Sequence, residues 1–239
     1  MSGAKISLVI PAYNEENYID ACLDHAINNS GGQFCEIIVV DNASIDRTAE
    51  VAARHPGVRV VREAEKGTGH ARERGWREAR GDIIAYIDAD CHTPPGWVEK
   101  ILGEFARQPR LACLSGPCYY HDLPRWQQAL VNGYWRLARL PYRLTGYMML
   151  GGNCAIRREV LEKLNGFDTS IAFYGDDTDL ARRASKFGQV KFKSDFIIHT
   201  SGRRLTKQGM VNTGFTYGLN FFSQVFARRT VTKNYLDIR

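Results

Sequence analysis

The chain has 239 residues, of which 44% are hydrophobic and 24% are charged, with 22 glycines and 8 prolines. This ordinary globular composition excludes disordered, collagen-like and fibrous proteins, and a chain of this length folds without disulfide bonds or structural zinc. The formal net charge is +6. Residues 1–118 hold 13 Lys and Arg against 17 Asp and Glu, a net charge of −4, whereas residues 119–239 hold 19 against 9, a net charge of +10.

The chain shows no signal for secretion or for membrane insertion. No apolar run approaches the roughly 18 uncharged residues that a spanning helix needs. Residues 1–10 lack the basic start and small-residue cleavage site of a secretory signal. The six cysteines are unevenly spaced, without paired C-x-x-C motifs, and we expect reduced thiols. The expected location is the cytoplasm, in solution or peripherally on the cytoplasmic face of the membrane.

Short Ile- and Val-rich runs alternate with helical patterns through the first half of the chain. The runs at 6–10, 36–40, 58–61 and 82–87 predict strands. Between the first two, apolar residues recur at helical spacing from Ile19 to Ile27 and predict a helix that Gly31 and Gly32 end. A second helix is expected to start with Ser44 or Asp46 as its N-cap and to end before Pro56. This alternation predicts an α/β fold with a mostly parallel, doubly wound sheet flanked by helices.

Beyond Ser115 the pattern changes to longer helical stretches with fewer strands. No Pro- or Ser-rich linker separates the parts, so residues 1–115 and 116–239 are expected to form two halves of one compact domain. Two stretches carry apolar residues at helical spacing with basic residues around them, one from Trp126 to Leu137 and one from Phe215 to Phe226, before Arg228 and Arg229. These apolar faces suit either the core of the second half or an anionic membrane surface.

Polar residues follow several of the predicted strands. Tyr13 and Glu15 come after the first strand and Asp41 ends the second, at the sheet edge where α/β proteins bind ligands. No G-x-G-x-x-G motif follows the first strand, which disfavours an NAD-binding protein. The fourth strand runs into Asp88 and Asp90, whose side chains point the same way in an extended segment. Such a carboxylate pair suits Mg²⁺ or Mn²⁺, although turns also use Asp freely.

Two later positions have both a structural and a functional interpretation. Asp176, Asp177 and Asp179 open a predicted helix, where acids act as capping residues or as catalytic groups. His199 follows an apolar run, and a histidine there is either packed in the core or a ligand.

Taken together and in order, these segments resemble the family-2 inverting glycosyltransferases of the GT-A fold. The matching segments are VIPAYNEE (9–16), IIVVDNASIDRT (37–48), GHARERGWREARGDIIAYIDAD (69–90), GGNCAIRREVLEKLNGFD (151–168), YGDDTDLARR (174–183) and IIHTSGRR (197–204). The resemblance implies transfer of a sugar from a nucleoside-diphosphate sugar to an acceptor hydroxyl, with inversion in a single displacement. The first half would bind the donor and the second half the acceptor.

The resemblance also implies roles for individual residues. Asp177 would be the general base, although Asp176 stands where the family usually has Glu, and Asp176 and Asp179 stay open as alternatives. Asp90 and His199 would bind the divalent metal, Mg²⁺ or Mn²⁺. The nucleotide would contact Pro11, Ala12, Tyr13, Glu15, Asp41, Arg72 and Asp88. The acceptor side would include Asp176, Gly152 and Asn153.

The processive members of this family carry a Q-x-x-R-W segment and spanning helices. Residues 200–205 lack that segment, so transfer of a single sugar is expected. A UDP-sugar is the expected donor, with GDP or dTDP as the other candidates, and the acceptor is a sugar or a lipid-linked molecule. Two other functions stay open: a sugar nucleotidyltransferase and a non-catalytic nucleotide-sugar-binding module. No nucleic-acid-binding module is visible, and we expect no nucleic-acid partner.

Overall fold

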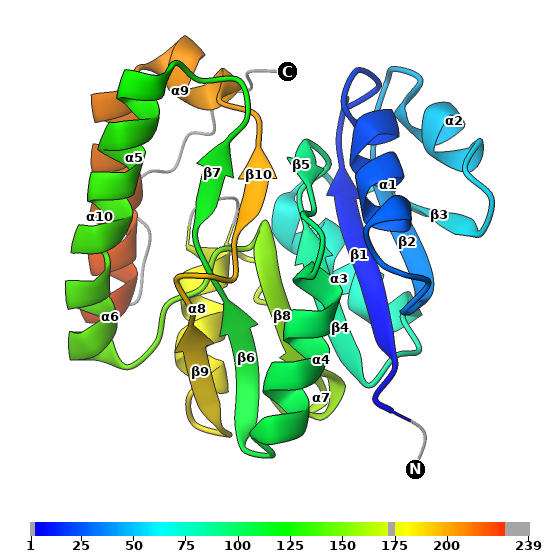
Figure 1. Ribbon diagram of the computed structural model, residues 1–239. Coiled ribbons are helices and arrows are strands. Elements are labelled where there is room, and N and C mark those ends of the chain that lie inside the picture. The colour runs from blue at the N-terminus through cyan, green and yellow to red at the C-terminus, as the bar shows by residue number, and fades with distance from the viewer. Residues whose placement is uncertain (1–2, 172–174, 228–239) are drawn as a thin grey trace.

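The computed structural model describes residues 3–171 and 175–227. Its main sheet has seven strands in the order β3-β2-β1-β4-β8-β6-β9 (Figure 1). Strands β1 to β4 are parallel, and β8 runs antiparallel to its neighbours β4 and β6. Along the sheet the strand bounds are Val58–Glu63, Phe34–Asn42, Ile6–Ala12, Ile83–Ile87, Asn153–Arg157, Leu111–Ser115 and Gln189–Phe192.

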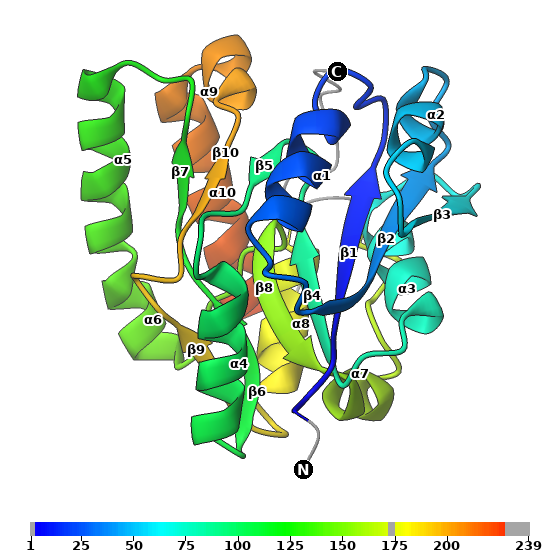
Figure 2. The same ribbon diagram turned by 45° about the vertical axis from the view of Figure 1, so that its right-hand side comes forward.

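Helices cover both faces of this sheet (Figures 1 and 2). Successive strand residues point to opposite faces, so Leu8 and Val9 of β1 belong to different core clusters. One face packs against α1 (Ile19–Asn28), α2 (Thr48–Ala53) and α4 (Trp97–Arg107). The other packs against α3 (Thr68–Glu78), α7 (Arg158–Leu164) and α8 (Asp176–Ala184). The result is the three-layer α/β architecture that the alternating pattern predicts.

A smaller sheet and four further helices stand at one end of the main sheet (Figure 1). The small sheet has the order β5-β10-β7, formed by Cys91–His92, Ile198–Thr200 and Cys118–Tyr120. Beyond it lie α5 (Arg125–Leu137), α6 (Arg139–Thr145), α9 (Arg203–Gln208) and α10 (Met210–Ala227). Among the helices of the described residues, none has the length and hydropathy required to cross a bilayer.

The four predicted strands and the first helix are confirmed, and all six cysteines are free. The predicted start of the second helix at Ser44 or Asp46 is wrong, because α2 begins at Thr48. The side chain of Asp46 accepts the backbone N–H of Thr48 at 3.0 Å from outside the helix, and that of Ser44 accepts the N–H of Asn14 at 3.0 Å. Both polar side chains organise the turn that follows β2.

The second half contributes more to the sheet than its sequence pattern suggests. Strand β8, from residues 153–157, lies between β4 and β6 of the first half. Strand β9 pairs with β6 in parallel at the sheet edge. The segments predicted as two halves therefore share one continuous sheet.

Candidate active site

The carboxyl ends of β1 and β2 bring the predicted nucleotide-binding residues together. Tyr13 follows β1, and the Lys66 ammonium lies 3.9 Å from the centre of its ring. Asp41 is the penultimate residue of β2, and its carboxylate is almost fully buried. It accepts the Ser44 N–H at 3.3 Å and lies 3.6 Å from Nε of Arg62. The Arg62 side chain, by contrast, is largely exposed. Pro11 and Ala12 are the last residues of β1, and Ala12 is buried.

A buried arginine connects the donor side of the site to the helix that bears the predicted base. Arg72 of α3 is buried and donates to Asp176 at 2.6 Å and to Asp88 at 3.2 Å. The two carboxylates hold the pKa of Arg72 above its ordinary value despite burial, which acts in the opposite direction. Asp176 is buried against this guanidinium, whereas the side chain of Asp88 is half exposed. Of this pair, only Asp88 can reach a ligand.

Two glycines allow this network to pack. A Cβ on Gly151 would lie 2.5 Å from the Arg72 guanidinium, and a Cβ on Gly152 would lie 2.4 Å from Oδ2 of Asp88. Any side chain at either position would displace these charged groups. Gly152 therefore lies beside Asp88 on the donor side, and its role is to leave room for that carboxylate.

Asp177 differs from its two acidic neighbours on α8. Its carboxylate accepts the N–H of Thr178 at 2.6 Å and that of Gly151 at 3.2 Å, and the side chain is half-buried. Burial, and then the nearby charge of Asp176, raise the pKa of Asp177 to about 6. A carboxylate that is ionised at neutral pH yet holds protons more tightly than usual is suited to act as a general base.

The other two acids of this helix are held in ion pairs. Asp176 pairs with Arg72, and Asp179 pairs with Arg182 at 2.5 Å and with Arg183 at 2.6 Å. Both are buried, and guanidinium groups occupy their carboxylate oxygens. The geometry therefore favours Asp177 over Asp176 and Asp179. Asp176 holds Arg72, and its burial leaves it no contact surface for an acceptor.

Asp90 lies at the centre of a second charged group. Arg203 of α9 contacts Asp90 at 3.0 Å and the buried Glu15 at 2.5 Å, and the Thr200 hydroxyl donates to Asp90 at 3.1 Å. The two carboxylates hold the pKa of Arg203 above its ordinary value. This group joins the ends of β1, β4 and β10, so one arginine from the second half closes the edge of the site formed by the first half.

Comparison with known proteins identifies the family of the chain. The model of the family described as Glycosyl transferase family 2 matches residues 7–165. The chain belongs to this family. It is 30% identical over 191 residues to the chondroitin synthase of Escherichia coli, and this alignment covers 78% of the chain. The chain spans 27% of that much longer protein.

Solved structures show the same fold. Glucosyl-3-phosphoglycerate synthase from Mycobacterium tuberculosis, in complex with Mn²⁺, UDP and phosphoglyceric acid, superposes with a TM-score of 0.68 at 24% identity, covering 95% of this chain and 78% of that chain. Mannosyltransferase PcManGT from Pyrobaculum calidifontis, in complex with GDP-Man and Mn²⁺, superposes with a TM-score of 0.66 at 24% identity, covering 89% and 63%. The predicted GT-A fold is confirmed.

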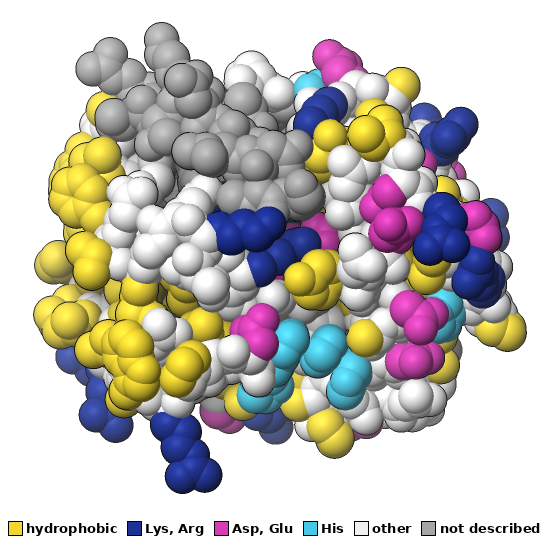
Figure 3. Space-filling view, turned by 90° about the horizontal axis from the view of Figure 1, so that it is seen from above, with side chains coloured by type: hydrophobic (Ala, Val, Ile, Leu, Met, Phe, Trp, Pro, Cys, Tyr) yellow, Lys and Arg dark blue, Asp and Glu magenta, His cyan; other side chains and the backbone are white. Residues whose placement is uncertain are grey.

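In this family-2 glycosyltransferase, the structure does not bring His199 to Asp90. Thr200 makes the contact with Asp90, and neighbouring strand residues point to opposite sides, so His199 faces the other side of β10. There it is paired in the small sheet with His92, which stacks between His25 and His121 with ring centroids 4.2 and 4.3 Å apart. Figure 3 shows histidine side chains gathered near the middle of the face seen from above. Burial, and then the nearby His121 and His25, lower the pKa of His199.

The predicted metal site is therefore smaller than the resemblance implies. Within residues 3–171 and 175–227, no three His, Cys, Asp or Glu side chains converge as they would in a protein-only metal cage. Asp90 and Asp88 supply hard oxygen ligands from one strand end. Mg²⁺ and Mn²⁺ accept such ligands, and Mg²⁺ typically completes its shell with water and substrate phosphates. The residues present fit an ion bound jointly by one or two carboxylates and a diphosphate.

The prediction that Asn153 contacts the acceptor is wrong. Its side chain is fully buried at the start of β8. The amide nitrogen donates to the carbonyls of Pro117 and Phe196 at 3.2 and 2.8 Å, and the amide oxygen accepts the indole N–H of Trp97 at 3.0 Å. Asn153 fixes the loops around β8, and no surface of it reaches a ligand.

Arg203 is the principal site residue that the motif analysis did not assign. The segment IIHTSGRR was part of the family resemblance, yet its arginines received no role. Their position after β10 does not show which strand ends they reach, because the contact with Glu15 joins residues 188 positions apart. The available signal was a basic residue, Arg203, four positions after the predicted metal ligand His199.

Proposed function

We propose that this family-2 glycosyltransferase transfers one sugar from a nucleoside-diphosphate sugar to an acceptor hydroxyl, with Asp177 as the general base. The observation that carries the proposal is the difference between two adjacent acids. Asp176 is buried in an ion pair with Arg72 at 2.6 Å, while Asp177 is half-buried with a pKa raised to about 6. Acid–base sites typically contain two neighbouring carboxylates whose different surroundings give them different roles.

Each part of the site has a role in this proposal. Asp177 takes the proton of the acceptor hydroxyl as that oxygen attacks C1 of the sugar, and the bond from C1 to the diphosphate breaks in the same displacement. The anomeric centre is therefore inverted. Arg72 keeps Asp88 oriented toward the donor, and Tyr13, Glu15 and Asp41 line the nucleotide side. Gly151 orients the base through its backbone N–H.

A divalent ion fits beside the donor diphosphate. Asp90, with Asp88 two residues before it, would hold Mg²⁺ or Mn²⁺, and the ion would stabilise the negative charge of the departing diphosphate. Arg203 neutralises Asp90 and Glu15 in the structure. We leave His199 out of the proposed metal site. Thr200 faces Asp90 and donates to it, and His199, the preceding residue of β10, faces the opposite side of the strand.

The proposed donor is a UDP-sugar, with a GDP- or dTDP-sugar as the other candidates. The synthase structure contains UDP and the mannosyltransferase structure contains GDP-Man, and both contain Mn²⁺. The proposed acceptor is a sugar or lipid-linked hydroxyl, to which single residues are added.

The test incubates the protein with UDP-, GDP- and dTDP-sugars, Mn²⁺ and a panel of sugar acceptors, and measures the nucleoside diphosphate released and the anomeric form of the product by NMR. The proposal expects release of a diphosphate from one donor class and a product of inverted configuration. A nucleotidyltransferase would instead form a nucleotide sugar and release pyrophosphate from a nucleoside triphosphate. Donor binding with no turnover for any acceptor or for water would favour a binding module.

A further inference from the structure

Helix α10 has its polar side inward and its apolar side outward. The residues that it buries are Thr213, Asn220 and Gln224. Its large exposed side chains include Val211, Phe215, Leu219, Phe222 and Phe226, which are apolar and recur at helical spacing. A helix packed on a soluble core normally shows the reverse pattern. The sequence did not decide whether the apolar face of this stretch packs on the core. In the structure these five side chains are exposed, so they do not pack on the core.

Helices α5 and α6 add to the same apolar surface. Trp126, Leu130, Tyr134 and Leu137 form an exposed stripe on α5, and Leu140 and Leu144 continue it on α6. The inner sides of these helices and of α10 are joined through a small cluster that includes Trp135, Tyr142 and Phe221. Figure 3 shows hydrophobic side chains gathered at the end of the molecule where α5 and α10 lie. Exposed apolar surface on this scale marks an interaction site.

The charged residues of the helices at this end of the molecule are all basic. Helices α5, α6, α9 and α10 contain no Asp or Glu, and their basic residues are Arg125, Arg136, Arg139, Arg143, Arg203, Arg204 and Lys207. Within the part of the chain that the structure describes, Arg125, Arg136, Arg139 and Arg143 form no ion pair with a carboxylate. Arg228 and Arg229 extend the basic sequence but lie outside the described residues.

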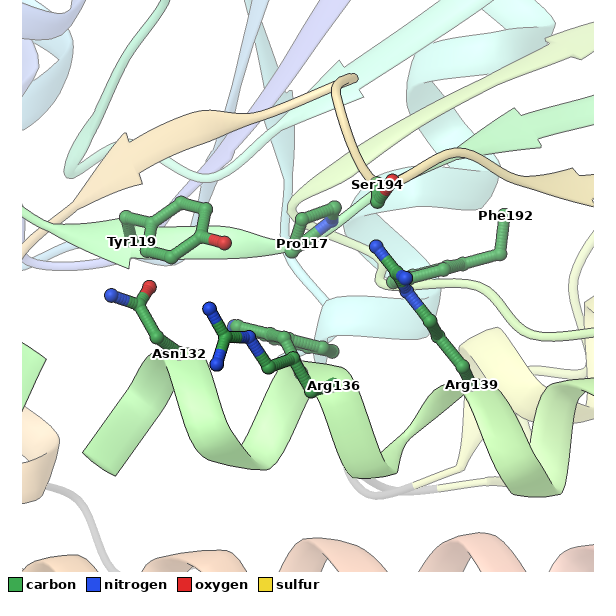
Figure 4. Close-up of a pocket in the computed structure, with 8 residues that line it drawn as sticks. Pro117, Tyr119, Asn132, Arg136, Arg139, Phe192 and Ser194 are labelled. Atoms are coloured by element: carbon green, nitrogen blue, oxygen red, sulfur yellow. The ribbon is translucent and has the colours of Figure 1, made fainter. Parts of the chain in front are cut away.

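Two of these arginines point into a groove of about 310 Å³ between α5 and the small sheet (Figure 4). Arg136 and Arg139 project from the helices toward Tyr119 and Ser194, and Phe192 lies beneath Arg139. Guanidinium groups with no carboxylate partner, beside hydroxyl groups, suit the phosphate of an anionic headgroup.

We propose that the surface formed by α5, α6 and α10 binds an anionic lipid membrane. Helices that lie in the membrane interface typically carry large apolar side chains on one face, with arginine and lysine beside them. Two copies of this chain meeting through these faces would place arginine against arginine without an acid to neutralise them, which disfavours a dimer through this surface. A nucleic acid would satisfy the arginines but not the exposed Leu and Phe side chains. A lipid surface satisfies both, because acyl chains accept the apolar groups and phosphates accept the guanidiniums.

The test measures sedimentation of the full chain with vesicles of phosphatidylcholine alone or with 30% phosphatidylglycerol, without donor or metal. The proposal expects binding to the anionic vesicles in 20 mM salt and its loss in 500 mM salt, because added salt screens charge attraction over a shorter distance. The apolar variant Leu144→Gln/Phe226→Gln should lose binding. The charge variant Arg139→Gln/Arg143→Gln should bind more than about tenfold more weakly, since each basic residue near an anionic surface contributes about fivefold.

Matched controls change the same residue types elsewhere. Ile45→Gln/Phe187→Gln removes two exposed apolar side chains, and Arg110→Gln/Lys186→Gln removes two exposed positive charges, outside the proposed surface. Both controls should bind as the unchanged protein does, and all four variants should keep their melting temperatures because the side chains are exposed. The proposal is overturned if the unchanged protein ignores anionic vesicles at low salt, if both surface variants bind normally, or if Leu144→Gln/Phe226→Gln instead breaks a dimer in a protein that binds no vesicles. Since no donor is present, these results do not depend on the proposed transfer reaction.

Discussion

Asp176 and Asp177 are adjacent in the sequence, yet the fold gives them different chemistry. Asp177→Asn should lower transfer by at least about a hundredfold, the lower range of general-base contributions, and leave donor binding unchanged. Asp176→Asn should instead weaken donor binding and stability, because it leaves Arg72 buried with less compensating charge. Steady-state kinetics and calorimetric donor titration of both variants check this. An active Asp177→Asn protein beside an inactive Asp176→Asn protein would reverse the assignment.

The raised pKa of Asp177 predicts a specific pH dependence. The base works only when ionised, so kcat should fall about tenfold per pH unit as the pH drops below about 6. The folded state also binds this proton more tightly than the unfolded chain does, so ionisation of Asp177 costs stability above its folded pKa and not below its unfolded pKa. Asp177→Asn should therefore raise the melting temperature at pH 7.5 and not at pH 3.5. A flat rate profile from pH 5 to 7 would contradict the assignment.

Gly152 offers a test of the donor side. Gly152→Ala places a Cβ 2.4 Å from the Asp88 carboxylate, which must then turn away from Arg72. We expect weaker donor binding with little loss of stability, because the Asp88 side chain is half exposed and can move. Gly133→Ala in α5 is the control, since a Cβ there meets nothing within 4 Å. Donor titration and melting curves of both variants check the prediction, and equal donor affinity in the two would contradict it.

The motifs of the chain predicted most of the site but not the partners of its residues. Asp41, Asp88, Asp90 and Asp177 are at or beside strand ends or a helix start, which local patterns indicate. The burial of Asn153 and the orientation of His199 depend on loops and on a strand pairing that are remote in the sequence. Likewise, only the folded chain distinguishes Asp177 from its two acidic neighbours. Asp176 pairs with Arg72, and Asp179 pairs with Arg182 and Arg183.

At the level of elements, α9 connects the second half of the chain to the donor edge, the strand ends that carry Glu15, Asp88 and Asp90. Arg203 of this helix contacts Glu15 and Asp90 at that edge. Arg203→Ala should cost on the order of 3 kcal/mol in the free energy of unfolding, because the carboxylate of Glu15 stays buried without this cation. Urea unfolding measures this change. The double variant Arg203→Met/Glu15→Gln should recover much of the loss, and equal destabilisation of the single and double variants would contradict the pairing.

The regular elements were predictable where apolar periodicity is strong. Strands β1 to β4 and helix α1 follow directly from it, because each buries a continuous apolar run or stripe. Strand β8 was not predicted, since Asn153–Arg157 begins and ends with polar residues and its place between β4 and β6 is a long-range pairing. For α5 and α10 the sequence predicted amphipathic helices correctly but not which side faces outward. That choice depends on the polar contacts that α10 buries.

For the whole molecule, the uneven charge separates two surfaces. The acidic first half supplies the carboxylates of the donor edge, and the basic second half supplies Arg203 and the exposed surface of α5, α6 and α10. The proposed function requires that the donor edge bind a nucleoside diphosphate together with a divalent ion. If it does not, the fold stands but the proposed function is wrong.

The most direct test is a melting-temperature panel of UDP, GDP, dTDP and CDP, with and without Mn²⁺, on the unchanged protein and on Asp90→Asn. At a hundredfold excess over Kd, a bound ligand adds about 2.7 kcal/mol, which raises the melting temperature of a chain of this size by about 5 to 10 °C. We predict such a rise for one nucleotide, UDP first, only when Mn²⁺ is present, and its loss in Asp90→Asn but not in His199→Ala. No shift with any nucleotide, or a shift that neither Mn²⁺ nor Asp90→Asn changes, would contradict the account.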